Sequence, residues 1–143
     1  MLSICSKPDQ HSEALTDFKE QEWPIADILQ YGKPLPSFNK YRGVLIALED
    51  TAVVGYISFT LELGVALIES LIVGKAQRNQ GIAKQLVVAM ESDAQAQGAH
   101  KVLLETGANW IARHLYASLG YTLRTELKEH YNHQDFVLMD KNI

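Results

Sequence analysis

Three apolar segments follow one another in the middle of the chain, separated by short polar turns. They cover residues 41–49, 52–62 and 65–73, with turn-forming residues at 49–51 and 62–64. Apolar runs of this length that end at such turns predict strands, and strands joined by short turns pair with one another. The pattern therefore predicts a three-stranded antiparallel meander.

A helical pattern follows from Gly81 to Gln97, and Gly98 is expected to end that helix. Apolar residues recur at steps of three and four, which indicates an amphipathic helix. The stripe consists of Ile82, Ala83, Leu86, Val87, Met90 and Ala94. A short strand is predicted next, at 101–106. Residues 65–106 thus form strand, helix and strand, the pattern of a parallel pair with a right-handed crossover.

The C-terminal part adds a helix at 109–119 and strands at 121–127 and 135–141. Together these elements predict an α/β (α+β) domain, a mixed, mostly antiparallel sheet flanked by helices.

The N-terminal part is predicted to be more irregular. Residues 2–5 are expected to form a short strand, 9–22 an exposed helix and 25–31 a second helix. Trp23-Pro24 is expected to separate the two helices, because proline suits only the first turn of a helix.

The composition limits the class of protein. The 143 residues are 47% hydrophobic and favour a single domain over 1–143. The net charge of −4 argues against nucleic acid as the main partner and suits cationic substrates. Cys5 is the only cysteine, which excludes an intrachain disulfide. With neither a signal-peptide pattern nor an apolar run of bilayer length, a cytoplasmic protein without membrane contact is expected.

The turn at residues 77–84 carries the first candidate chemistry. It joins a strand to a helix, where free N–H groups and the helix dipole favour phosphate. Gly81 lets a ligand approach the backbone, and Arg78, Lys84 and Lys75 add positive charge. A Walker loop would need Gly-Lys-Ser/Thr, and a dinucleotide fingerprint would need three glycines. Neither is present. An ordinary solvated turn stays open at this point.

A second motif follows the next strand. Asn109, Ala112, Tyr116 and Leu119 lie at steps of three and four and share one helix face. Asn109 is expected to be the N-cap of this helix. Asn109 and Tyr116 can then face one cleft.

The stretch from Ile68 to Tyr121 resembles the GNAT superfamily of acyl-CoA-dependent N-acyltransferases. The matching motifs read I-E-S-L-I-V, R-N-Q-G-I-A-K, L-E-T-G-x-N and L-Y-x-x-L-G-Y. One departure is Ala83, at a position that is often glycine and needs only a small residue.

The resemblance implies a GNAT fold in which acyl-CoA lies between splayed strands, here 65–73 and 101–106. The backbone of Leu71, Ile72 and Val73 would pair with the pantetheine arm. A backbone N–H near Leu71 or Ile72 would polarise the thioester carbonyl. Asn109 would hydrogen-bond the cofactor arm. The pyrophosphate would be held by Arg78, Asn79, Gln80, Gly81, Ile82, Ala83 and Lys84.

The resemblance also implies direct attack of an amine on the thioester. Tyr116 matches the tyrosine that lies near the cofactor sulfur and would be the acid that protonates the thiolate. It would also belong to the cofactor site. Glu69 would be the base, with Glu105 a weaker candidate. The alternatives are a core tyrosine for Tyr116 and a solvent-facing residue for Glu69.

The acceptor side is less well defined by sequence. His130 and His133 are interpreted as a polar loop at the acceptor mouth rather than a metal site, which needs more ligands. Carboxylates beside aromatics near the N-terminus would suit a cationic amine, although a solvated helix face is equally consistent with them. These residues are Asp17, Glu20, Glu22, Trp23, Asp27 and Tyr31.

The sequence therefore predicts an N-acetyltransferase that moves the acetyl group of acetyl-CoA to a primary amine of a small molecule or peptide, with no metal. One alternative is a non-catalytic acyl-CoA-binding regulatory module on the same fold. Another is an interaction module without a ligand. Apolar residues in the last strands leave a homodimer open.

Overall fold

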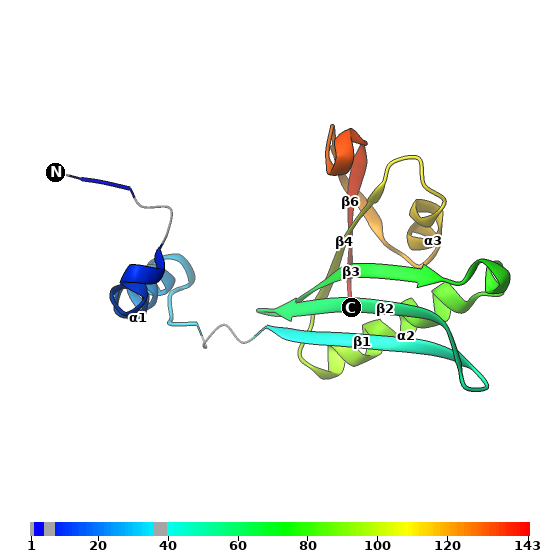
Figure 1. Cartoon of the computed structure of the whole chain (residues 1–143), viewed down its shortest axis with the longest axis horizontal. Helices are drawn as coiled ribbons and strands as arrows, with labels where there is room; N and C mark the ends of the chain where they lie inside the picture. Colours follow the sequence, from blue (N-terminus) through cyan, green and yellow to red (C-terminus); the bar gives the residue numbers. More distant parts are fainter. Residues whose placement is uncertain (1, 5–7, 36–39) are drawn as a thin grey trace. The chain divides into compact units, whose positions relative to one another are not determined.

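The computed structural model describes residues 2–4, 8–35 and 40–143 (Figure 1). The chain divides into two compact units, Met1–Ser37 and Phe38–Ile143. Each unit is described by itself, and the single domain over 1–143 stays a prediction.

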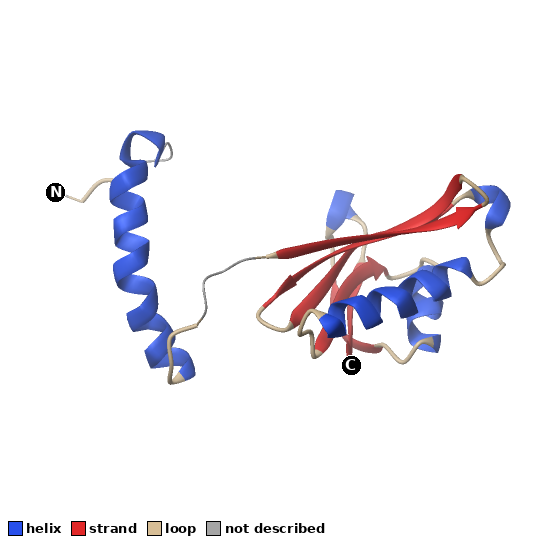
Figure 2. Cartoon of the chain, turned by 90° about the horizontal axis from the view of Figure 1, so that it is seen from below, coloured by secondary structure: helices blue, strands red, loops and turns tan. Residues whose placement is uncertain are grey.

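The first unit is built around one long helix (Figure 2). A short 3-10 helix, η1 (Pro8–His11), leads into α1 (Ser12–Tyr31). The prediction of two helices separated at Trp23-Pro24 is wrong, because α1 continues through Pro24. Proline lacks its own N–H and crowds the carbonyl of the preceding turn, yet the helix continues, with the helix formers Glu22 and Ala26 two residues away on either side. Residues 2–4 form no strand, and Cys5 lies outside the described residues.

The second unit contains a six-stranded mixed sheet in the order β1-β2-β3-β4-β6-β5. The first three strands form the predicted antiparallel meander, and β3 pairs with β4 in parallel, as predicted. Their bounds are β1 (Tyr41–Glu49), β2 (Ala52–Glu62), β3 (Val65–Val73), β4 (Lys101–Gly107), β5 (Thr122–Leu127) and β6 (Phe136–Asn142).

Helices connect and cover these strands. The 3-10 helix η2 (Lys75–Gln77) and α2 (Ile82–Ala96) link β3 to β4, while α3 (Ala112–Ser118) links β4 to β5. A third 3-10 helix, η3 (Tyr131–His133), precedes β6. Among the described helices, none combines the length and the apolar character needed to cross a bilayer.

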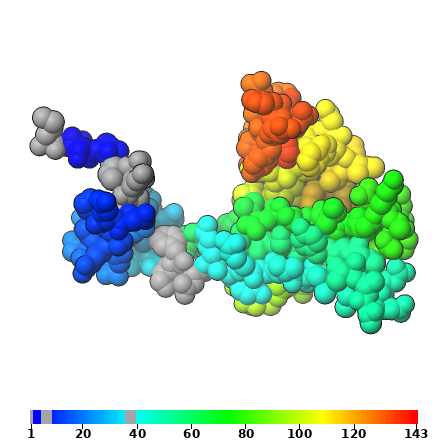
Figure 3. Space-filling view, viewed as in Figure 1, coloured from blue at the N-terminus to red at the C-terminus, as the bar shows by residue number. Residues whose placement is uncertain are grey.

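The core lies between α2 and the sheet. The apolar stripe of α2 packs inward, with Leu86, Val87, Met90 and Ala94 buried as predicted. Burying such side chains contributes about 1.5–3 kcal/mol each. From residue 40 to the C-terminus the elements fill one continuous body (Figure 3). The largest fully buried side chains are Phe59, Ile57, Met90, Leu104, Met139, Val87, Val102 and Val137.

Candidate active site

The parallel strands β3 and β4 separate soon after they meet. They pair only over residues 65–67 of β3 and 101–103 of β4. Beyond that point β3 stays paired with β2 up to Val73, and β4 stays paired with β6 up to Gly107. The two facing edges therefore leave backbone groups for another partner, and such an edge can accept an extended ligand.

The β2–β3 register determines which backbone groups of β3 face this opening. The Gly74 N–H donates to the Val54 carbonyl at 2.8 Å, and Ile72 lies opposite Tyr56. Because successive residues of a strand point their N–H and C=O groups to opposite edges, Ile72 faces β2. Leu71 and Val73 then face away from β2. The Val73 carbonyl accepts a hydrogen bond from Arg78 Nε at 3.2 Å.

The turn between β3 and α2 supplies a group of free donors. Asn79 and Gly81 adopt left-handed conformations, with φ of 63° and 77°. The first helical hydrogen bond of α2 runs from the Gln85 N–H to the Gly81 carbonyl at 3.1 Å. The N–H groups of the first turn have no acceptor within the helix, so they point out of its N-terminus. This geometry can hold an anion.

A cleft of about 560 Å³ lies beside this turn, between β3, the start of α2 and α3. Arg78 and Lys84 are its charged residues from the turn, and His114 faces it from α3. It is lined by most of the predicted cofactor-binding residues, namely Leu71, Ile72, Val73, Arg78, Asn79, Gly81, Ile82, Ala83 and Lys84.

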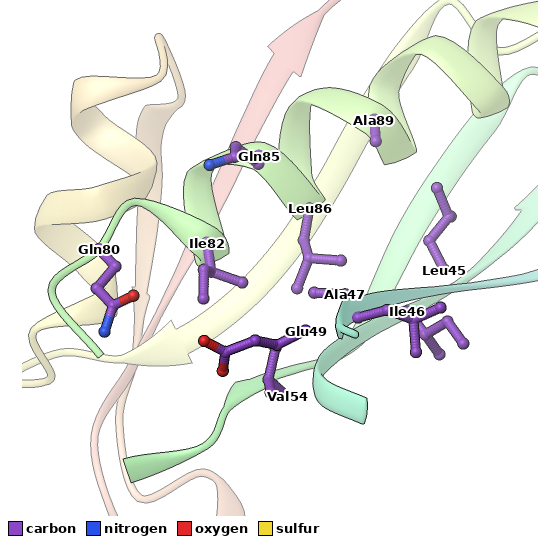
Figure 4. Close-up of a pocket in the computed structure, with 11 residues that line it drawn as sticks. Leu45, Ile46, Ala47, Glu49, Val54, Gln80, Ile82, Gln85, Leu86 and Ala89 are labelled. Carbon is purple, nitrogen blue, oxygen red and sulfur yellow. The ribbon is translucent and has the colours of Figure 1, made fainter. Parts of the chain in front are cut away.

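Gln80, Asn109 and Tyr116 are the three exceptions, and Tyr116 lines a neighbouring cavity instead. Gln80 lines a separate hollow of about 450 Å³ between α2 and strands β1 and β2 (Figure 4). Asn109 is exposed in the turn before α3 and lines neither the cleft nor that cavity. The prediction that it caps this helix is wrong, because α3 begins at Ala112 and Ile111 takes the N-cap position. The turn after β4 is three residues longer than the helical periodicity indicated, because α3 begins at Ala112 and not at Asn109.

A cavity of about 360 Å³ adjoins the cleft at the splayed ends of β3 and β4. Leu71, Ile72 and Ala112 line both, so the two lie side by side. Tyr116 lines this second cavity and is only 5% exposed. Burial raises the pKa of its hydroxyl to about 12.

The Tyr116 hydroxyl has no hydrogen-bond partner among the described residues. Yet no buried side-chain oxygen or nitrogen lacks a partner in the described part of the chain. The hydroxyl must therefore reach the open space of the cavity. At neutral pH it carries its proton there.

Glu69 lines the same cavity because of a bulge in β3. Ser58 pairs with Ser70, but the next residue of β2, Phe59, pairs with Ile68. Glu69 is thus an extra residue on β3, and a bulge of this kind re-aims a side chain next to a site. Glu69 is exposed, and its carboxylate has no ion-pair or hydrogen-bond partner within residues 2–4, 8–35 and 40–143.

Glu105 lies across from Glu69, near the end of β4. Its carboxylate is 2.9 Å from His130 Nε2, and it raises the pKa of the Tyr131 hydroxyl through its charge and through hydrogen bonding. Glu69, Glu105 and Tyr131 also line a third cavity of about 420 Å³, which continues outward. In the described ranges, no three His, Cys, Asp or Glu side chains form a group able to hold a metal.

The sequence analysis missed several of these residues. On α3, His114, Leu115 and Ser118 line the cleft. His114 and Leu115 precede Ser118 by four and three residues, a helical spacing that was a usable signal. Trp110 and Tyr131 gave no such signal, because the turn after β4 and the η3 segment come together only in the fold, where both rings pack against Phe136. His130 was expected in a polar loop at the acceptor mouth, but its contact with Glu105 was not predicted.

The predicted acceptor wall near the N-terminus lies on α1. Its acidic and aromatic side chains are mostly exposed. Asp27 is buried, and its carboxylate lies 3.4 Å from the Leu35 N–H, which donates to it. A role for α1 in the acceptor site stays a prediction.

Comparison with known proteins agrees with this architecture. An acetyltransferase from Bacillus cereus ATCC 14579 has a TM-score of 0.73 at 18% identity, over 100% of this chain and 99% of that chain. A GNAT family acetyltransferase from Elizabethkingia anophelis with acetyl-CoA bound has a TM-score of 0.65 at 18% identity, over 83% and 81%. No curated protein matches the sequence. The model of the acetyltransferase (GNAT) family matches residues 9–121. This chain therefore belongs to the acetyltransferase (GNAT) family.

Proposed function

We propose that the protein transfers the acetyl group of acetyl-CoA to a primary amine by direct attack. The observation that carries this proposal is a cleft with an adjoining cavity, which together extend from the donor-rich turn before α2 to the hydroxyl of the buried Tyr116 ring. A cofactor with an anionic diphosphate at one end and a thioester at the other would match these two ends.

In this proposal, the N–H groups at the start of α2 hold the diphosphate, with Arg78 and Lys84 beside it. The pantetheine arm runs along the free edge of β3 and pairs with the backbone of Leu71 and Val73. Gln80 and Asn109 do not line the cleft, so in this proposal their side chains make no direct contact with the cofactor.

The carbonyl of the thioester would accept a hydrogen bond from the Leu71 N–H. Leu71 is favoured over Ile72 because the register directs the Ile72 N–H toward β2. A donor aimed at the developing oxyanion stabilises the tetrahedral intermediate and is worth about 3 kcal/mol in comparable enzymes.

The transfer itself needs two proton movements. The neutral amine attacks the carbonyl carbon, a C–N bond forms and the C–S bond breaks. The nitrogen then gives a proton to Glu69, directly or through water, and the departing thiolate receives one from Tyr116. The burial that keeps the Tyr116 hydroxyl protonated also makes a thiolate beside it more basic, because desolvation disfavours both anions.

A panel of amines with acetyl-CoA tests the proposal, with release of free thiol as the readout. Turnover with at least one primary amine is expected. Stabilisation by CoA without any turnover would instead indicate a binding module, since a ligand that binds the native state raises the melting temperature. A cytoplasmic location and a homodimeric assembly stay predictions.

A further inference from the structure

The two ends of the cleft differ in charge. Arg78 and Lys84 border the cleft at the turn, and none of the described residues that line it there is acidic. Glu69 and Glu105 border both cavities at the opposite end, where the described lining residues include no lysine or arginine. The acceptor end is therefore an anionic surface.

The two carboxylates have different surroundings. Glu69 projects from the β3 bulge without a partner among the described residues. Glu105 is held by His130, and its side chain and that of His130 are only 29% and 31% exposed. A carboxylate can only accept, so His130 Nε2 donates to Glu105 at 2.9 Å and fixes the direction of the carboxylate. Glu105 is thus an oriented anion rather than a mobile one.

Aromatic rings border the same end. Trp110 and Tyr131 are 54% and 61% exposed, and each packs its ring 5.2 Å from that of Phe136. Trp110 lines the cavity with Tyr116, while Tyr131 lines the outer cavity. Exposed aromatic faces beside carboxylates suit a cation with an aliphatic chain.

Only one cationic group of the acceptor loses its charge in the reaction. The reacting nitrogen must be neutral when it attacks, and the amide it forms is neutral too. The Tyr116 ring is buried, and its hydroxyl, which lacks a partner in the described structure, reaches this cavity. In the proposed mechanism the nitrogen meets the thioester beside this hydroxyl, and Glu69 takes the proton that the nitrogen loses. Glu105 keeps its negative charge and would stabilise a cation that survives the reaction.

We infer that the acceptor is a small amine with a second positive charge, of the aliphatic diamine or polyamine class. The reacting nitrogen lies between Tyr116 and Glu69, and the second cation lies against Glu105 and the ring of Tyr131. The cavities of about 360 and 420 Å³ are of a size for such a molecule. This inference rests on the proposed function.

The test compares 1,4-diaminobutane with n-butylamine and 4-aminobutan-1-ol, which share its four-carbon chain but carry one charge, and the amino alcohol also matches its length. At saturating acetyl-CoA, kcat/KM for the diamine is expected to exceed that of either monoamine by about tenfold or more. A tenfold preference is well above the statistical factor of two that arises because a diamine has two equivalent reactive amino groups. The preference should fall as salt is added, because the carboxylates are partly exposed.

Single substitutions test whether Glu105 causes the preference for the diamine over the monoamines. In Glu105→Gln the ratio of kcat/KM for diamine to that for butylamine should fall to about two, whereas in Glu126→Gln it should match wild type. Glu126 is an exposed carboxylate that lines none of the three cavities. If Glu105→Gln does not fold, Tyr131→Ala serves as a second variant and should also lower the ratio.

Each outcome bears on a different statement. A wild-type ratio near two, or a preference for a peptide without a second cation, overturns the inference and leaves the proposed function intact. An undiminished ratio in both Glu105→Gln and Tyr131→Ala overturns the assigned subsite. Absence of thiol release with every amine, including a lysine-containing peptide, overturns the proposed function as well.

Discussion

Tyr116 and Glu69 border one cavity in opposite environments. Tyr116 is 5% exposed and lies edge to face with Tyr121, at 5.5 Å between ring centroids. Glu69 is exposed and stands on a bulge. Tyr116, the proposed acid, lies in a buried position that keeps it protonated until the thiolate leaves. Glu69, the proposed base, is in contact with water. Single substitutions at these two positions therefore test the proposed mechanism directly.

Tyr116→Phe is expected to lower kcat by about tenfold or more, because a positioned acid contributes at least that much. The affinity for acetyl-CoA should change little, since the ring and its packing remain. Steady-state kinetics and a binding titration measure the two quantities. An unchanged kcat at saturating substrates would remove Tyr116 from the mechanism.

Glu69→Gln is expected to lower the rate mainly at lower pH. There proton removal from the nitrogen limits the reaction and few other acceptors are present, whereas at high pH hydroxide can take the proton that the attacking nitrogen loses. The measurement is kcat/KM against pH for the variant and wild type, with Glu126→Gln as a matched control. Profiles of the same shape would show that Glu69 is not the base.

The elements of the second unit were largely predictable from sequence, because their patterns are local. The first three strands match the predicted bounds, since short turns delimit each apolar run. The acceptor end was not predictable in the same way. Glu105 contacts His130 there, and the rings of His130 and Trp110 both pack against Phe136, although the chain separates these residues. No periodicity in the sequence indicates such contacts. The bulge at Glu69 likewise depends on pairing with β2.

A substitution at Gly81 tests whether the turn before α2 binds the diphosphate. It adopts φ of 77°, where an added Cβ meets no atom within 4 Å. Gly81→Ala should therefore cost about 1–2 kcal/mol of stability through backbone strain. It should also weaken CoA binding, because the methyl group would enter the space assigned to the diphosphate.

Gly98→Ala is the matched control. Gly98 also has a positive φ, of 98°, and open space around its Cβ position. It follows α2 at the end remote from the turn. We expect similar loss of melting temperature in both variants but weaker CoA affinity only in Gly81→Ala. Equal CoA affinity in the two would contradict the assigned diphosphate site.

At the scale of the whole second unit, one buried carboxylate on β6 forms ion pairs with basic side chains of both neighbouring strands, β4 and β5. Asp140 on β6 lies 2.6 Å from Arg124 Nε on β5 and 3.4 Å from Lys101 Nζ on β4. The hydrogen bond from Arg124 is the main cause that lowers the pKa of Asp140 below its ordinary value. Its contribution to stability is therefore present above the unfolded pKa and lost as the pH falls through the folded pKa.

Asp140→Asn should reduce the free energy of unfolding by about 2 kcal/mol at neutral pH, the usual size for a hydrogen bond to a charged group. The difference from wild type should shrink as the pH is lowered from about 5 to about 2. Urea unfolding across this range measures it. The control is Glu62→Gln, which removes only the exposed pair with Lys40 and should change little. A difference for Asp140→Asn that stays constant with pH would contradict the assignment.

The alternating backbone of β3 also gives the protein a built-in reporter of cofactor binding. Without ligand, the amides of Leu71 and Val73 face the opening and should exchange with deuterium quickly, while the Ile72 amide, held by β2, should exchange slowly. Acetyl-CoA should protect Leu71 and Val73 and leave Ile72 nearly unchanged. Protection from exchange at alternate residues of β3 would show an extended ligand on this edge without any turnover. Uniform protection along the strand would instead indicate a different mode of binding.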